Sequence, residues 1–145
     1  MKISTIYLGA DHAGFALKEK IKKELTRQGH EIQDLARRRV PGDDYPPYGK
    51  AVAQAVARDK NSCGILVCGS GIGMAIAANR VRGVRALVGH SSAETKLARE
   101  HNDVNILALP GRKFKPPTAF TLIKIFLKTP FSKAVRHHRR VGELS

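Results

Sequence analysis

Tryptophan is absent from this chain of 145 residues, and cysteine and aromatic residues are scarce. The two cysteines, Cys63 and Cys68, are separated by four residues, which matches neither a CxxC redox pair nor a zinc-ligand pair. Two unpaired thiols fit a reducing compartment, so we expect a cytoplasmic protein. The few aromatic residues, 6% of the chain, form no cluster typical of a single-strand nucleic-acid binder.

Long hydrophobic runs are also missing. No stretch approaches the ~18 apolar residues of a membrane span, and segment 1–6 lacks the apolar core of a signal peptide. Hydrophobic residues nevertheless make up 42% of the chain, enough to bury a core. We therefore expect one globular domain over residues 1–145, with no internal repeat and no membrane partner.

Acidic residues are few. The chain has 12 Asp and Glu against 26 Lys and Arg, which leaves a net charge of +14. This charge favours an anionic partner: a phosphorylated metabolite, a nucleic acid or an acidic surface. The basic segments 37–39 and 137–140 keep a nucleic-acid-binding module open as an alternative. Since no helix-turn-helix or zinc-finger pattern accompanies them, we expect nucleic acid to bind only through non-specific charge.

Strand-like and helix-like segments alternate along the chain. The apolar, β-prone runs occupy residues 5–9, 30–35, 65–68, 84–89 and 104–109. This alternation predicts an α/β fold, a Rossmann-like three-layer sandwich with a five-stranded parallel sheet. In the first helix, Leu17, Ile21 and Leu25 form the apolar stripe, so Lys18 and its neighbouring lysines are expected to face water.

A glycine-rich loop follows the third apolar run. Gly69, Gly71 and Gly73 come directly after Cys68, and a helix-forming run begins at Ile72. Glycines let the backbone approach an anion closely, and the amides that open the helix point at it. The alternative is a turn that only reverses the chain. The GxGxG spacing differs from the GxGxxG of dinucleotide-binding folds, so we expect no dinucleotide cofactor.

Two polar residues, Asp11 and His12, follow the first predicted strand. Parallel strands end at one edge of a sheet, so we expect His12 to face the same crevice as the glycine loop. Asp11 alternatively caps the following helix. Segment 9–14 has the GxxxxG spacing of a P-loop but continues with Phe15, not Lys-Ser/Thr, which excludes one. The six histidines show no metal-ligand spacing, so no metal is expected.

Four short motifs stand in a specific order along the chain. They are Gly9-Ala10-Asp11-His12-Ala13-Gly14-Phe15, Asp44-Tyr45-Pro46, Cys68-Gly69-Ser70-Gly71-Ile72-Gly73 and Arg99-Glu100-His101-Asn102-Asp103. In this combination, from residue 3 to about 141, the chain resembles the type B ribose-5-phosphate isomerases. Galactose-6-phosphate isomerase subunits are close relatives of that family, but the intact segment 100–103 is more similar to the pentose enzymes.

The resemblance implies an aldose–ketose isomerase that interconverts ribose 5-phosphate and ribulose 5-phosphate through a 1,2-enediolate, without a metal. By similarity Cys68 is the base, and the positive end of the following helix favours its thiolate form. The alternative for Cys68 is a small buried hydrophobe. His101 corresponds to the group that opens the sugar ring. Some family members use a glutamate after the glycine loop as the base, whereas Met74 stands there in this chain.

The resemblance also assigns the residues that bind substrate. Ser70 and the loop amides would hold the enediolate oxygens, and planar guanidinium groups suit the phosphate. The implied substrate-binding residues are Asp11, His12, Tyr45, Gly69, Gly71, Ile72, Gly73, Asn102, Arg112, Arg136 and Arg140. Tyr45 is either a lid over the ligand or simple packing, and the last two arginines are alternatively part of an exposed basic helix.

The family builds its active site between two subunits. A homodimer, or a tetramer, is therefore implied, with a C-terminal helix that reaches the partner.

The alternative substrate is a 6-phosphohexose such as allose or galactose 6-phosphate. Ring size and chain length are discriminated by the dimensions of the pocket, so the sequence leaves both substrates open.

Overall fold

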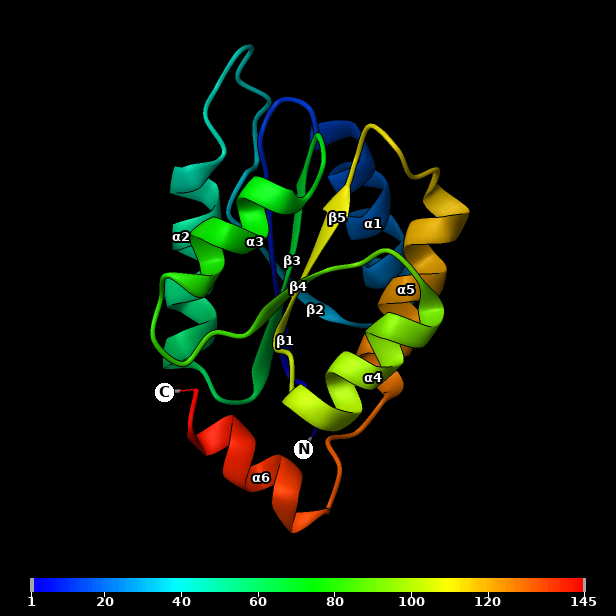
Figure 1. Cartoon of the computed structure of the whole chain (residues 1–145). Helices are drawn as coiled ribbons and strands as arrows, with labels where there is room; N and C mark the ends of the chain where they lie inside the picture. Colours follow the sequence, from blue (N-terminus) through cyan, green and yellow to red (C-terminus); the bar gives the residue numbers. More distant parts are fainter. Residues whose placement is uncertain (1, 145) are drawn as a thin grey trace.

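The structure, a computed structural model that describes residues 2–144, contains the predicted parallel sheet. Its five strands are all parallel and lie in the order β2-β1-β3-β5-β4 (Figure 1). The strands are β1 (Thr5–Ala10), β2 (Glu31–Asp34), β3 (Ser62–Cys68), β4 (Ala86–Val88) and β5 (Ile106–Pro110). The α/β sandwich predicted from the alternating pattern is thereby confirmed.

Six helices accompany the sheet over the described residues. They are α1 (Phe15–Arg27), α2 (Pro46–Arg58), α3 (Ile72–Asn79), α4 (Ser92–Asn102), α5 (Pro116–Lys128) and α6 (Val135–Gly142). The helices α2 and α3 cover one face, α1 and α5 cover the other, and α4 packs beside α5. In Figure 1 the helix α6 lies away from the layers, at the end of the sheet where α4 ends. Within residues 2–144, no helix has the length and apolar character needed to cross a membrane.

The centre of the core is β3, in which all seven residues are buried. Its side chains alternate between two clusters, one with α1 and α5 around Ile65 and one with α2 and α3 around Leu66. Strands that are buried on both faces are continuous apolar runs, which is the pattern this segment shows. Burying each such side chain contributes about 1.5–3 kcal/mol, so this strand fixes the position of the loop that follows it.

The expectation that Lys18 faces water is wrong. Its side chain is fully buried, and Nζ donates hydrogen bonds of 2.8 Å to Oδ2 of Asp34 and 2.8 Å to the carbonyl oxygen of Ala36. Helical periodicity missed this because Lys18 lies beside the apolar stripe of α1, where the end of β2 covers it. A paired and fully hydrogen-bonded buried charge is tolerated where an isolated one is not.

The start of α1 also differs from the expectation. The helix begins at Phe15, and the Asp11 carboxylate accepts hydrogen bonds from the amides of Ala13 and Gly14, both at 3.0 Å. Asp11 therefore caps the turn before the helix, not the helix itself. A side chain at Gly14 would overlap the carbonyl of Val67 at 2.1 Å, so the glycine lets this turn lie directly on β3.

The sheet order places a topological switch between β1 and β3. From β1 the chain continues to β2 on one side, whereas β3, β5 and β4 lie on the other. Open parallel sheets bind ligands outside the carboxyl ends of the strands that flank such a switch. The turn after β1 and the glycine loop after β3 meet at this point.

Candidate functional site

A pocket of about 380 Å³ opens at the carboxyl ends of β1 and β3. Three segments line it: the turn after β1, the loop before α2 and the glycine loop, with one residue from the β5–α5 connection. The lining residues are Asp11, His12, Ala13, Asp43, Asp44, Tyr45, Cys68, Gly69, Ser70, Gly73 and Arg112. Eight of the residues predicted from the sequence are thus brought together here.

Cys68 is the last residue of β3 and is 4% exposed. Its side chain packs against the core on one side and lines the pocket on the other. The backbone N–H of Gly71 donates a hydrogen bond to Sγ at 3.1 Å. Gly71 adopts the left-handed conformation, φ +77°, at the N-cap of α3. This contact holds the sulfur at the start of α3, on the side of the strand that borders the pocket.

The β5–α5 connection is tied to the glycine loop by backbone hydrogen bonds. The amide of Gly111 donates to the Cys68 carbonyl at 2.7 Å, and that of Arg112 donates to the Gly69 carbonyl at 3.1 Å. The guanidinium group of Arg112 lies over Gly69, where a Cβ would be 3.0 Å from Nη1. A cationic fork is therefore held beside the thiol.

The aromatic ring of Tyr45 covers the start of α3. A Cβ at Gly73 would lie 2.4 Å from the ring, so only glycine accommodates Tyr45 in this position. The side chain packs on α3 and also lines the pocket. Ser70 lines the same pocket, and its Oγ accepts a hydrogen bond of 3.2 Å from the amide of Ile72.

Asp43 lines the pocket but was not singled out by sequence reasoning. Its Oδ1 accepts the backbone N–H of His12 at 2.7 Å, and its Oδ2 accepts the Tyr48 hydroxyl at 2.7 Å. Partial burial alone would raise the pKa of Asp43, but the hydrogen bonds from Tyr48 and His12 outweigh it and lower the pKa. The run Asp43-Asp44 was the only sequence signal, and its contact with His12 spans 31 residues.

Of the other six predicted residues, Gly71 and Ile72 belong to the same loop, at the start of α3, and four lie elsewhere. His101 and Asn102 end α4, and Arg136 and Arg140 lie on α6. Asn102 is close to the amino end of β5, whereas Cys68 pairs with Pro110 at its carboxyl end. One strand of this length spans about 13 Å, so a single chain does not bring these residues to Cys68.

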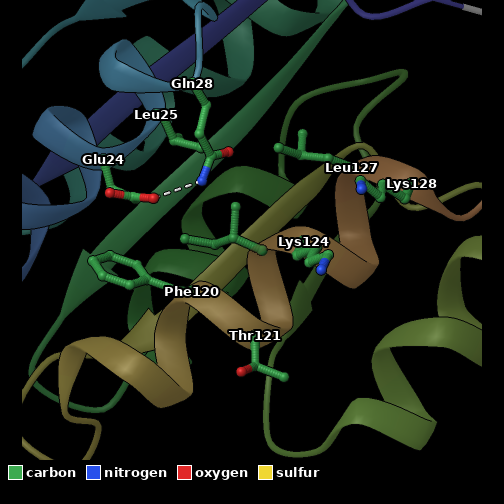
Figure 2. Close-up of a pocket in the computed structure, with 9 residues that line it drawn as sticks. Glu24, Leu25, Gln28, Phe120, Thr121, Lys124, Leu127 and Lys128 are labelled. Carbon is green, nitrogen blue, oxygen red and sulfur yellow. Dashed lines mark hydrogen bonds between the residues drawn. The ribbon is translucent and has the colours of Figure 1, made fainter.

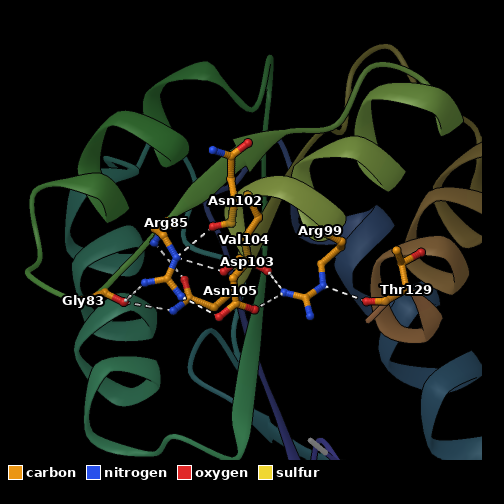
Figure 3. A network of polar contacts seen from close by, with 8 residues as sticks. All are labelled: Gly83, Arg85, Arg99, Asn102, Asp103, Val104, Asn105 and Thr129. Carbon is orange, nitrogen blue, oxygen red and sulfur yellow. Dashed lines mark hydrogen bonds and ion pairs between the residues drawn. The ribbon is translucent and has the colours of Figure 1, made fainter. Parts of the chain in front are cut away.

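A polar network fixes the end of α4 (Figure 3). The Asp103 carboxylate contacts Arg99 at 2.9 Å and Arg85 at 3.2 Å, and Nε of Arg85 donates to the Asn102 carbonyl at 3.0 Å. Asp103 itself has φ +46°, which ends the helix in the left-handed conformation. The backbone that carries Asn102, and His101 beside it, is therefore rigidly attached to the sheet.

His101 stacks on a residue that sequence reasoning missed. Its ring centroid is 4.2 Å from that of His137 on α6, with the planes tilted by 31°. His137 is buried, and its Nδ1 has no hydrogen-bond partner among the described residues. Burial lowers the pKa of His137, and the nearby His101 and Arg136 lower it further.

A larger cavity, about 480 Å³, lies far from the thiol, between α1 and α5 (Figure 2). Leu25, Phe120, Ile123 and Leu127 make its wall, with Glu24 and lysines at the rim. It holds no thiol, histidine or glycine loop, and it is remote from the topological switch. The smaller pocket combines the thiol, the glycine loop and the topological switch, so it is the candidate site.

The chain is similar to known proteins over nearly its full length. The model of the family described as Ribose/Galactose Isomerase matches residues 6–144. A ribose-5-phosphate isomerase B of Mycobacterium tuberculosis is 42% identical over 141 residues, which covers 97% of this chain and 87% of that protein. The ribose-5-phosphate isomerase B of Escherichia coli is 38% identical over 140 residues, with 97% and 93% covered.

Solved protein structures are also similar to this chain, in sequence and in fold. A ribose 5-phosphate isomerase from Thermotoga maritima superposes with a TM-score of 0.92 at 43% identity and covers 97% of both chains. A ribose-5-phosphate isomerase B from Mycoplasma genitalium, solved with bound ribulose-5-phosphate, has a TM-score of 0.92 at 33% identity, with 99% of this chain and 95% of that one covered. None of these relatives favours the nucleic-acid-binding alternative.

Proposed function

The chain belongs to the ribose/galactose isomerase family, and from this premise we propose that its pocket interconverts ribose 5-phosphate and ribulose 5-phosphate through a 1,2-enediolate. The observation that carries the proposal is the Cys68 thiol, hydrogen-bonded at the start of the glycine loop, with Arg112 over Gly69 in the same pocket. The Mycoplasma genitalium relative holds ribulose-5-phosphate, the ketose of this pair.

The proposed chemistry moves one proton between neighbouring carbons. The Cys68 thiolate takes the proton from C2 of the open-chain aldose, and the electron pair forms the C1–C2 double bond while O1 becomes an oxyanion. The amide of Gly73 and the hydroxyl of Ser70 stabilise the developing charge, while the amide of Gly71 is bound to the sulfur. The thiol then returns its proton to C1, which restores the thiolate, and transfer of the O2 proton to O1 leaves the C2=O2 carbonyl of the ketose.

Phosphate binding and ring opening need groups that this pocket lacks. Its lining carries three carboxylates, Asp11, Asp43 and Asp44, but only one guanidinium, that of Arg112. A phosphate dianion therefore requires further positive charge. We assign Arg136, Arg140, His101 and Asn102 of a second copy of the chain to this role, with His101 donating or relaying the proton that opens the ring.

An apolar patch beside the site supports a homodimer. Ile72 and Ile76 lie one turn apart on α3, directly after the glycine loop, and are 53% and 60% exposed. Two neighbouring exposed isoleucines suit a subunit contact more than solvent. Burying them against a second copy would place that copy next to Cys68. The two free cysteines also fit the cytoplasm, where we propose that the protein acts as one domain.

A coupled isomerase assay on ribose 5-phosphate tests the proposal. Changing Cys68 to alanine is expected to lower turnover by more than about 10²-fold, because it removes the base. Cys63→Ala is the matched control: Cys63 lies on the same strand but is buried outside the pocket lining, and burial raises the pKa of its thiol to about 12. Equal rates in the two variants would refute the mechanism, and no turnover of ribose 5-phosphate by the unmodified protein would refute the function.

A further inference from the structure

We propose that Asp43 is a positioning residue: it accepts a hydrogen bond from the Nδ1–H group of His12. The unprotonated Nε2 of His12 is then the ring nitrogen that contacts the sugar phosphate. This inference rests on the proposed function of the pocket. His12 follows β1 and Asp43 lies in the loop before α2, so the contact joins two of the three segments that build the site.

The geometry around Nδ1 leaves only one assignment. This nitrogen is 3.1 Å from Oδ1 of Asp43 and 3.1 Å from its backbone carbonyl oxygen. A carbonyl oxygen accepts and never donates, and an ionised carboxylate does the same. Nδ1 must therefore carry a proton when it faces these two oxygens, and in the neutral ring Nε2 then holds the free lone pair.

Asp43 is itself held in place from both sides. Its Oδ1 accepts the backbone N–H of His12 at 2.7 Å, and its Oδ2 accepts the hydroxyl of Tyr48 at 2.7 Å. The carboxylate side chain is 12% exposed and the His12 side chain is 29% exposed. The acceptor is thus mostly buried and anchored, while the imidazole is the more exposed of the two groups.

The charged groups that share the pocket with His12 are Asp11, Asp44 and Arg112, apart from Asp43. None of them has a hydrogen bond to the His12 ring, so Asp43 is the residue that orients it. A carboxylate that holds a histidine ring selects both its tautomer and its direction, as the aspartate of a Ser-His-Asp triad does. At metal-bound histidines, loss of such a supporting partner typically costs about 10- to 100-fold in metal affinity or activity, and we expect an effect on the same scale for His12.

The tautomer is tested first, on the free protein and without substrate. ¹⁵N NMR of the histidine rings distinguishes a protonated nitrogen from a bare one. We expect neutral His12 to carry its proton on Nδ1. A proton on Nε2 would overturn the proposal whatever the activity of the protein, so this result is independent of the proposed function.

Activity in four variants then separates positioning from simple support of the loop. Asp43→Ala is expected to lower kcat/KM about 10- to 100-fold, and Asp43→Asn is expected to restore most of it, because its amide oxygen still accepts both N–H groups of His12. In a His12→Ala background, Asp43→Ala should cost no more than about twofold, since the ring it orients is gone.

A loss of the same size with and without His12 would overturn the proposal, because the carboxylate would then act only by anchoring its loop. Tyr48→Phe measures that anchoring directly, since it removes the bond to Oδ2 and leaves both contacts to His12. We expect its effect on kcat/KM to be smaller than that of Asp43→Ala, and an equal or larger effect would count against positioning.

Discussion

Arg99 and Asp103 form an ion pair across the last turn of α4, with Nη1 2.9 Å from Oδ1, and the same guanidinium group donates to the carbonyl of Val104. Both side chains are mostly buried, and Arg85 contacts the second carboxylate oxygen. The pair therefore links the helix that carries His101 to the start of β5.

Replacing Asp103 with asparagine is expected to lower the free energy of unfolding by about 1–2 kcal/mol, because charge-assisted hydrogen bonds weaken while the left-handed backbone is tolerated. Urea denaturation measures this change. Lys96→Ala is the control on the same helix: it removes an exposed 3.7 Å pair with Glu100, worth less than about 0.5 kcal/mol. Similar losses of unfolding free energy in the two variants would mean that the Asp103 network does not stabilise the end of α4.

Gly73 should tolerate no side chain while Tyr45 is present. An added Cβ would lie 2.4 Å from the Tyr45 ring, so Gly73→Ala must displace the ring from the pocket wall. Overpacking of this kind costs about 1–3 kcal/mol, and we expect kcat/KM to fall about tenfold. In a Tyr45→Ala background the same substitution should have a much smaller effect, since no ring remains to be moved. An undiminished loss there would place the cause elsewhere.

Local pattern was sufficient to predict the sheet and the glycine loop. The apolar run that ends at Cys68 and the glycines after it determine a strand, a turn and a helix within a few residues, and adjacent parallel strands then place Asp11 and His12 at the same edge. These features depend on interactions between sequence neighbours and on one topological rule.

Residues whose partners are distant in sequence were not predictable in this way. Asp43 meets His12 across 31 residues, and Lys18 reaches Asp34 across 16. In both cases a polar residue typical of a solvated surface is buried by a contact that no periodicity encodes. His137, likewise, is one of two adjacent histidines in a basic segment, and only the packing of α6 on α4 distinguishes it from its neighbour.

If each active site combines residues of two chains, as proposed, two inactive variants should restore activity when they are mixed. When Cys68→Ala and His101→Ala chains are co-expressed, each mixed dimer has one site with both groups intact, so random pairing should recover about a quarter of wild-type activity. The isomerase assay on the purified mixture measures this recovery.

The control for this experiment is a mixture of Cys68→Ala and Arg112→Ala chains. Both residues line the pocket of the same chain, so no mixed dimer has an intact site and no recovery is expected. Recovery in the control, or none with the His101 variant although mixed dimers form, would contradict the assignment of His101 to the second copy.

The buried ion pair of Lys18 and Asp34 should dominate the stability of the α1 region. Replacing Lys18 with methionine leaves the Asp34 carboxylate buried without its main partner, which is expected to cost about 3–5 kcal/mol in unfolding free energy at pH 7. Lys22→Met is the matched control, because Lys22 donates to the same Oδ2 at 3.0 Å from a side chain that is far more exposed. Its loss should stay below about 1 kcal/mol.

The pH dependence of this difference identifies its cause. Burial alone would raise the pKa of Asp34, but hydrogen bonds from Lys18, the Ala36 amide and Lys22 lower it. A carboxyl group whose pKa is lower in the folded state stabilises the protein above its unfolded pKa of about 3.9, and this contribution is lost as the pH falls through the folded value. In Lys18→Met the Asp34 carboxylate lacks the hydrogen bond that lowers its pKa most. Protonation in acid then removes the buried unpaired charge and, with it, the cost in unfolding free energy. Urea denaturation at pH 7 and near pH 3.5 should therefore show that the difference in unfolding free energy between the unmodified protein and Lys18→Met is smaller in acid. A difference that is the same at both pH values would assign the loss to packing of the lysine side chain.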